Sequence, residues 1–168
     1  MALNIVLLEP EMPANTGNIG RTCVATGTVL HLIEPLGFHL DDKSIKRAGM
    51  DYWPKLDVRR YINYQDFLDK NPNAIVYMAT TKARKVYSEV SYEDDCYLMF
   101  GKESAGIPEE ILKANEERCV RIPMNEDIRS LNLSNSVAIM LYEVLRQHSF
   151  KHMQLEGELH NLSWDDPI

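Results

Sequence analysis

Cysteine is scarce in this sequence, which contains three such residues, Cys23, Cys96 and Cys119. An odd and scattered set argues against a disulfide framework and lacks the paired spacing of a zinc site, so we expect free thiols and no metal. Long hydrophobic runs are also missing, since no stretch approaches the ~20 apolar residues that a membrane span needs. The apolar stretch near the start has no basic segment before it and ends at Glu9 and Pro10. We therefore expect a cytoplasmic protein with neither a signal peptide nor a membrane partner.

An excess of basic residues, the usual mark of a nucleic-acid-binding protein, is absent as well. The net charge is −7, from 18 Lys and Arg residues against 25 Asp and Glu residues. The charge is unevenly distributed, because residues 152–168 hold no Lys or Arg and four acidic residues. A chain of 168 residues suffices for one domain with one buried core. We predict a single domain over residues 1–151, followed by an acidic tail.

Basic residues gather locally within the body of the chain. The clusters are Lys43, Lys46 and Arg47; Arg59 and Arg60; and Lys82, Arg84 and Lys85. Local patches, more than net charge, determine phosphate binding. For any one cluster, the sequence leaves two interpretations open, a contact for nucleic acid or a solvated face.

Short apolar runs alternate with helical patterns along the chain. The pattern predicts strands over residues 3–8, 29–33, 58–62, 74–79, 97–100 and 119–122, and helices over 15–26, 41–48, 64–70, 108–114 and 133–148. We expect Asn15 or Thr16 to cap the first helix, Gly49 to end the second, and Pro108 to occupy the first position of the fourth. This alternation predicts an α/β fold with a mostly parallel sheet and helices on both faces.

In such sheets, ligands bind beyond the carboxyl ends of the strands. Three segments at those ends have unusual sequences. They are Asn15-Thr16-Gly17-Asn18-Ile19-Gly20-Arg21-Thr22; Leu98-Met99-Phe100-Gly101-Lys102-Glu103-Ser104-Ala105-Gly106-Ile107-Pro108; and Arg121-Ile122-Pro123-Met124 with Ser130-Leu131-Asn132-Leu133-Ser134-Asn135-Ser136. The second is not a phosphate-binding P-loop, because Glu103 stands where that motif needs a hydroxyl residue after Lys102. The third carries more Ser and Asn than a helix cap requires.

In order and spacing, the three segments resemble the motifs of the SPOUT superfamily of S-adenosylmethionine-dependent RNA methyltransferases. The resemblance covers residues 3–149 and implies a deep trefoil knot in the C-terminal part of the α/β domain. The stretch Arg47-Ala48-Gly49-Met50-Asp51-Tyr52-Trp53 is similar to a minimal bacterial branch, which methylates the ribose 2′-oxygen of the wobble nucleotide, position 34, in tRNA. The resemblance therefore implies 2′-O-methylation of a cytidine or modified uridine there.

The resemblance also implies roles for particular residues. S-adenosylmethionine would be bound by Ala79, Gly101, Ile122, Met124, Ser130 and Leu131. Arg21 would act at the 2′-hydroxyl, with Asn15, Glu103 and Asn132 around it. Because a guanidinium stays protonated, we expect Arg21 to position the phosphate and stabilise the developing alkoxide, and not to act as a base. Glu103 has a second interpretation, in which it only caps or pairs within its own loop.

The expected partners are tRNA and a second copy of the chain. The family forms homodimers through its last helix, and here that helix has apolar residues on more than one side, Ile139 and Tyr142 among them. RNA would cross the dimer interface, held by Arg21 and by Lys43, Lys46 and Arg47 of opposite chains. Two alternatives are the same chemistry on ribosomal RNA and a non-catalytic binding module. The second is disfavoured because a module that only binds would not need Asn15, Arg21, Glu103, Ser130 and Asn132 together.

Overall fold

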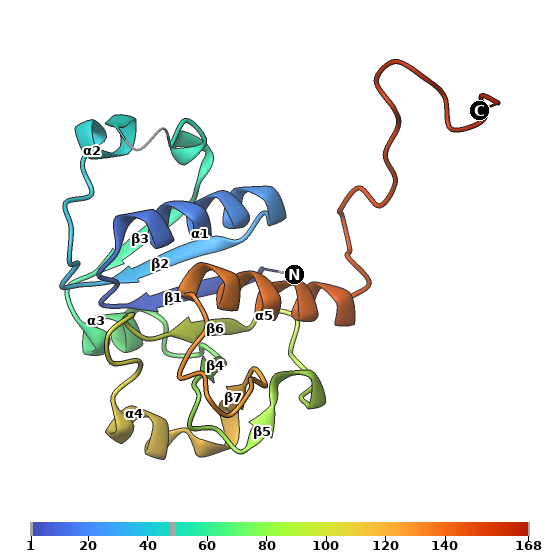
Figure 1. The fold of residues 1–168 in the computed structure, drawn as a ribbon. Coiled ribbons are helices and arrows are strands. Elements are labelled where there is room, and N and C mark those ends of the chain that lie inside the picture. The colour runs from blue at the N-terminus through green and yellow to red at the C-terminus, as the bar shows by residue number, and fades with distance from the viewer. Residues whose placement is uncertain (1, 48–49, 168) are drawn as a thin grey trace.

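The computed structural model describes residues 2–47 and 50–167. Seven strands of the described chain form one sheet, in which every pair of neighbours is parallel. The strands are β1 (Asn4–Leu8), β2 (Val29–Ile33), β3 (Val58–Tyr61), β4 (Val76–Ala79), β5 (Lys85–Val86), β6 (Tyr97–Phe100) and β7 (Cys119–Arg121). Their order across the sheet is β3-β2-β1-β6-β4-β7-β5 (Figure 1). The predicted α/β architecture is confirmed.

Helices cover both faces of this sheet (Figure 1). On one face lie α1 (Pro13–Thr26) and α5 (Leu133–Gln147), which pack against each other. On the other face lie α3 (Tyr64–Lys70) and α4 (Glu109–Ala114). The remaining elements are α2 (Asp42–Arg47) and the short 3-10 helices η1 (Trp53–Lys55), η2 (Tyr87–Glu89) and η3 (Glu116–Arg118).

The protein has one hydrophobic core on each face of the sheet, and the central strand β1 contributes to both. Ile5 and Leu7 join the core beneath α1 and α5, whereas Val6 and Leu8 join the core beneath α3 and α4. Successive side chains of a strand point to opposite faces, so a strand that is buried on both faces is apolar at nearly every position. This is why the sequence shows a continuous apolar run here.

Two predicted helix starts were wrong. The helix α1 begins at Pro13, with Met12 as its N-cap, so Asn15 and Thr16 lie buried within the helix and do not cap it. Proline suits the first helical position because an N–H at that position would have no acceptor within the helix. Pro108 is the N-cap of α4 and not its first helical residue. The predicted end of α2, at residues 48–49, lies outside the described residues.

A buried histidine ties the first two strands to the edge of the sheet. The Asn4 amide donates to two backbone carbonyls, so its Oδ1 accepts from Nε2 of His31 at 2.9 Å. Nδ1 of His31 therefore accepts from the Tyr61 hydroxyl, at 2.8 Å. Burial lowers the pKa of His31 to about 4, with the positive charge of Arg59 adding to the effect. The imidazole is thus neutral at physiological pH and serves the packing of β1, β2 and β3.

The chain leaves the body after α5 (Figure 1). Phe150 and Met153 still pack against the core, but Leu155, Leu162 and Trp164 are exposed. The boundary between domain and tail at residue 151 stays a prediction. No helix in the described part of the chain has the length and apolar character that a membrane crossing requires.

Candidate active site

A pocket of about 540 Å³ opens at the carboxyl edge of the sheet, near the point where the strand order turns back at β1 and β6. Doubly wound sheets place ligands at such a switch point. Four segments enclose it: the start of α1, the loop after β4, the loop after β6, and the segment between β7 and α5. Its lining residues are Met12, Asn15, Ala79–Lys82, Phe100–Ile107, Ile122, Met124, Arg129–Leu133 and Ser136.

Glu103 holds the start of α1 against the loop after β6. Its carboxylate accepts from the backbone N–H of Glu11 at 2.8 Å and from that of Met12 at 3.1 Å. It also accepts from the Asn15 side-chain amide at 3.2 Å. A carboxylate at a helix N-terminus satisfies free amide donors and complements the helix dipole. Glu103 thus stabilises the beginning of another element, and its bonds reach beyond its own loop.

Asn132 joins the third segment to this arrangement. Its Nδ2 donates to Oδ1 of Asn15 at 3.1 Å, while its own Oδ1 accepts from the backbone N–H groups of Ser134 and Asn135, at 2.9 and 3.3 Å. Asn132 is therefore the N-cap of α5 and a partner of α1 at once. Because Asn15 bonds both Glu103 and Asn132, three segments that are distant in sequence are fixed relative to one another.

The loop after β6 is a tight turn that depends on glycine. A Cβ at Gly101 would lie 2.0 Å from the backbone carbon of Gly106 and 2.2 Å from the Ile107 nitrogen. Gly106 has a positive φ of 71°, and its N–H donates to the Lys102 carbonyl at 2.8 Å. Glycine adopts this conformation without steric cost. Because its two glycines have no side chains, the turn brings backbone atoms directly to the pocket.

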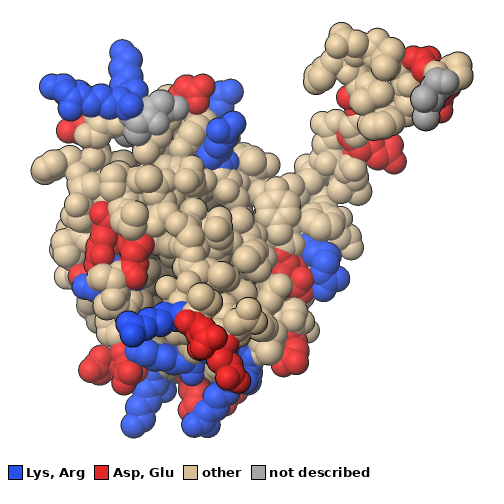
Figure 2. All heavy atoms as spheres, viewed as in Figure 1, with Lys and Arg blue, Asp and Glu red and all other residues tan. Residues whose placement is uncertain are grey.

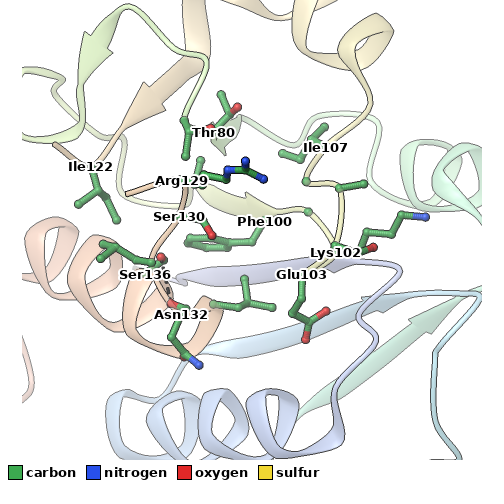
Figure 3. Close-up of a pocket in the computed structure, with 18 of the residues that line it drawn as sticks. Thr80, Phe100, Lys102, Glu103, Ile107, Ile122, Arg129, Ser130, Asn132 and Ser136 are labelled. Atoms are coloured by element: carbon green, nitrogen blue, oxygen red, sulfur yellow. Dashed lines mark hydrogen bonds between the residues drawn. The ribbon is translucent and has the colours of Figure 1, made fainter. Parts of the chain in front are cut away.

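The structure brings most of the predicted site residues together (Figure 3). Those that line the pocket are Asn15, Ala79, Gly101, Glu103, Ile122, Met124, Ser130, Leu131 and Asn132. Arg21 is not among the lining residues and lies exposed on α1. Its positive charge partly offsets the effect of burial, which raises the pKa of Tyr52. The hydroxyl of Tyr52, the residue before η1, donates to the Gly17 carbonyl, so the start of η1 lies beside α1.

Sequence analysis did not assign several lining residues to the site, of which Lys82, Lys102 and Arg129 carry charge. In Figure 3 the side chain of Arg129 extends toward Ile107. Its position directly before Ser130, at the edge of a segment already singled out, was a signal that could have found it. Lys102 also faces Glu9, with 3.9 Å between Nζ and Oε2.

The basic clusters fall into two kinds. Lys82, Arg84 and Lys85 pair with acidic residues of α4 and η3, at 3.0, 3.4 and 3.0 Å, and in Figure 2 blue and red atoms interleave along the lower edge. Arg59 and Arg60 also have acidic partners. By contrast, Lys43, Lys46 and Arg47 are exposed, and no ion pair joins them to an acidic side chain that the structure describes.

No group of three or more His, Cys, Asp or Glu side chains that could hold a metal ion occurs within the described ranges. The lining of the pocket consists of neutral amides, hydroxyls, backbone groups and apolar surface, with four charged side chains, those of Glu103, Lys82, Lys102 and Arg129. Such a lining suits an organic ligand that is recognised through a few hydrogen bonds and a flat apolar slot.

Comparison with known proteins gives consistent results. The model of the family described as SpoU rRNA Methylase matches residues 2–142. The chain is 51% identical over 146 residues to the tRNA (cytidine(34)-2′-O)-methyltransferase of Escherichia coli, a match that covers 86% of this chain and 93% of that protein.

Two solved structures are also similar. One, from a study of the 2-OH methylation of C/U34 on tRNA, has a TM-score of 0.82 and 41% identity, covering 89% of this chain and 98% of the other. The second, an AdoMet-bound rRNA methyltransferase from Sinorhizobium meliloti, has a TM-score of 0.76 and 26% identity, covering 86% of this chain and 56% of the other.

Proposed function

This chain belongs to the SpoU rRNA Methylase family, and we propose that it is a tRNA methyltransferase of the TrmL branch of the SPOUT superfamily. It transfers a methyl group from S-adenosylmethionine to the ribose 2′-oxygen of nucleotide 34. The similarity to the Escherichia coli enzyme, which covers most of both chains, favours this substrate over ribosomal RNA. The single observation that carries the chemistry is the convergence of three loops on one pocket, joined by Glu103, Asn15 and Asn132.

The pocket fits S-adenosylmethionine. At Gly101, where the structure has no room for a side chain, backbone faces the pocket directly, and Ile122 and Leu131 supply apolar surface for an adenine ring. When bound, the cofactor supplies an activated methyl group on a sulfonium. The protein then needs mainly to align the ribose oxygen, a task for which fixed geometry is effective. We assign Ala79, Met124 and Ser130 to the same cofactor site.

The alignment falls to Arg21, Asn15, Glu103 and Asn132. Within a single chain, Asn15 bonds to both Glu103 and Asn132, whereas Arg21 is outside the lining of that chain's pocket. In a homodimer, Arg21 would approach the pocket of the opposite copy and hold the phosphate beside the reacting ribose. A dimer is supported by apolar side chains on the α1 and α5 face: Met12, Ile139 and Tyr142 are 47%, 37% and 43% exposed.

The C-terminal knot belongs to the same proposal. Its support is the path of the chain between β7 and α5: residues 129–133 lie against the loops after β4 and β6, before α5 packs on α1. A cytoplasmic location also follows from the proposed function, because that is where bacterial tRNA is modified.

The test is a methylation assay with purified protein. Methyl-labelled S-adenosylmethionine is added to unmodified tRNA transcripts, native tRNA and ribosomal RNA, and modified riboses are mapped by nuclease digestion and mass spectrometry. We expect one methyl group per tRNA, on the ribose of nucleotide 34. Methylation confined to ribosomal RNA, or binding of the cofactor without any transfer, would contradict the proposal.

The exposed basic residues of α2 provide a second test. Reversing two charges, with Lys46→Glu and Arg47→Glu, should weaken tRNA binding at least about tenfold at low salt, because fewer phosphates are neutralised and fewer counterions are released. The slope of log affinity against log salt should also become shallower, by about 1 for each phosphate that the variant no longer neutralises. The matched control is Arg84→Glu with Lys85→Glu, which changes net charge equally at residues already paired with acids. Equal losses in both variants would mean that net charge alone governs binding.

A further inference from the structure

A second hollow lies beyond the carboxyl ends of β2 and β3, at the same edge of the sheet as the main pocket. It has a volume of about 470 Å³, and its walls include Glu34, Leu36, Phe38, Arg60 and Ile62. The backbone N–H of Glu34 donates to the Tyr61 carbonyl at 2.8 Å, so the two strand ends stay together. The hollow is thus formed by anchored backbone.

The wall between the two hollows is a single segment, residues 9–12. On one side, Gly37 N–H donates to the Pro10 carbonyl at 2.9 Å, and a Cβ at Gly37 would lie 2.7 Å from Cα of Glu11. On the other side, the Glu11 N–H donates to Glu103 in the main pocket. An RNA strand with its ribose in the main pocket would therefore pass the second hollow after crossing one loop.

The side chains of the second hollow suit a nucleobase better than a phosphate. Phe38 and Leu36 offer apolar surface for the face of a base, since stacking on an aromatic ring is tolerant of sequence. Arg60 and Glu34, which form an ion pair, offer a donor and an acceptor for the edge of a base. A carboxylate in the wall repels phosphate, so an anion site is disfavoured.

We propose that this hollow binds the base of a nucleotide adjacent to the methylated one in the tRNA anticodon loop. The inference rests on the proposed function and adds a specific RNA contact to it. Phe38 stacks on the base, and Arg60 with Glu34 contacts its edge. The hollow then sets the register of the strand, because the base on one side of the 9–12 segment fixes which ribose reaches the other side.

The experiment measures binding of an anticodon stem-loop RNA by fluorescence anisotropy, with the full-length protein and its variants. Phe38→Leu should weaken binding by about five- to 150-fold, the range expected when a stacked base is no longer held. Arg60→Gln should weaken it by a similar factor, because a contact to the edge of the base is lost. Affinity for S-adenosylmethionine, measured by calorimetry, should be unchanged. The matched control is Arg59→Gln, which removes the neighbouring charge of β3 on the opposite face of the strand, where Arg59 pairs with Asp57.

A second arm uses stem-loops with an abasic ribose immediately 5′ or 3′ of the target nucleotide. One of these RNAs should bind wild type more weakly by the same factor, and Phe38→Leu should no longer distinguish it from intact RNA. Variants that bind like Arg59→Gln, or equal losses from abasic RNA in wild type and variant, would overturn the inference. In either case, wild-type methylation at nucleotide 34 would leave the proposed function standing, whereas its absence would refute that function itself.

Discussion

Replacing Arg21 with alanine is expected to lower the rate of methyl transfer to tRNA by at least about 100-fold, the scale of losing one donor to a developing oxyanion. Affinity for S-adenosylmethionine should stay within about twofold of wild type, because Arg21 does not line the pocket of its own chain and, in the proposed dimer, holds the RNA phosphate and not the cofactor. The fold should survive, since the side chain is exposed and alanine is the best helix former. Single-turnover kinetics with saturating tRNA, beside calorimetry with the cofactor, measure the two quantities.

If Arg21 acts across a dimer interface, its role can also be tested by complementation between two inactive variants. Mixing the Arg21→Ala chain with a chain that lacks a working cofactor pocket should restore part of the activity, because one of the two shared sites would then be intact. Each variant alone should be inactive. Activity of Arg21→Ala close to that of wild type would remove the residue from the mechanism, whatever the oligomeric state.

Gly101→Ala should abolish detectable binding of S-adenosylmethionine and lower the free energy of unfolding by at least about 2 kcal/mol. The new Cβ would lie 2.0 Å from one backbone carbon and 2.2 Å from a backbone nitrogen, so the turn of residues 101–107 has to open. Opening it also displaces Glu103 and therefore the start of α1. Urea denaturation and calorimetry with the cofactor check the two effects.

Gly157→Ala is the matched control for this substitution. No heavy atom lies within 4 Å of a Cβ built at Gly157, which lies in the exposed tail. That variant should match wild type in stability and cofactor affinity. If Gly101→Ala behaved in the same way, the close approach of the turn would not be a requirement of the pocket.

The strands and the general site could be predicted because they depend on local pattern. Strands buried on both faces are apolar at nearly every position, and the segments rich in Gly, Ser and Asn follow strand ends, where parallel sheets bind ligands. The two-residue strand β5 was missed because so short a segment carries no periodicity. The start of α1 was also missed, since Asn15 is a typical capping residue in sequence but bonds to Glu103, 88 positions away.

Side-chain partners over long sequence separations lie beyond pattern analysis. Arg60, for example, pairs with Glu34, which is 26 positions away and follows another strand. The hollow that contains Arg60 therefore could not be anticipated. The role of Glu103 was left undecided for the same reason, because its partners Glu11 and Met12 belong to another loop.

The Glu103 carboxylate connects the pocket proposed for the cofactor with the helix that carries Arg21, the residue proposed to hold tRNA. It belongs to the loop that borders the pocket proposed for S-adenosylmethionine, and it accepts hydrogen bonds from the Glu11 N–H, the Met12 N–H and the Asn15 amide at the start of the helix that carries Arg21. If binding of the cofactor strengthens these three hydrogen bonds, the affinity for tRNA changes as well. By linkage, tRNA then changes the affinity for the cofactor by the same factor. Cofactor and tRNA should thus bind as a coupled pair, so that the order of their arrival alters rates and leaves the final equilibrium unaffected.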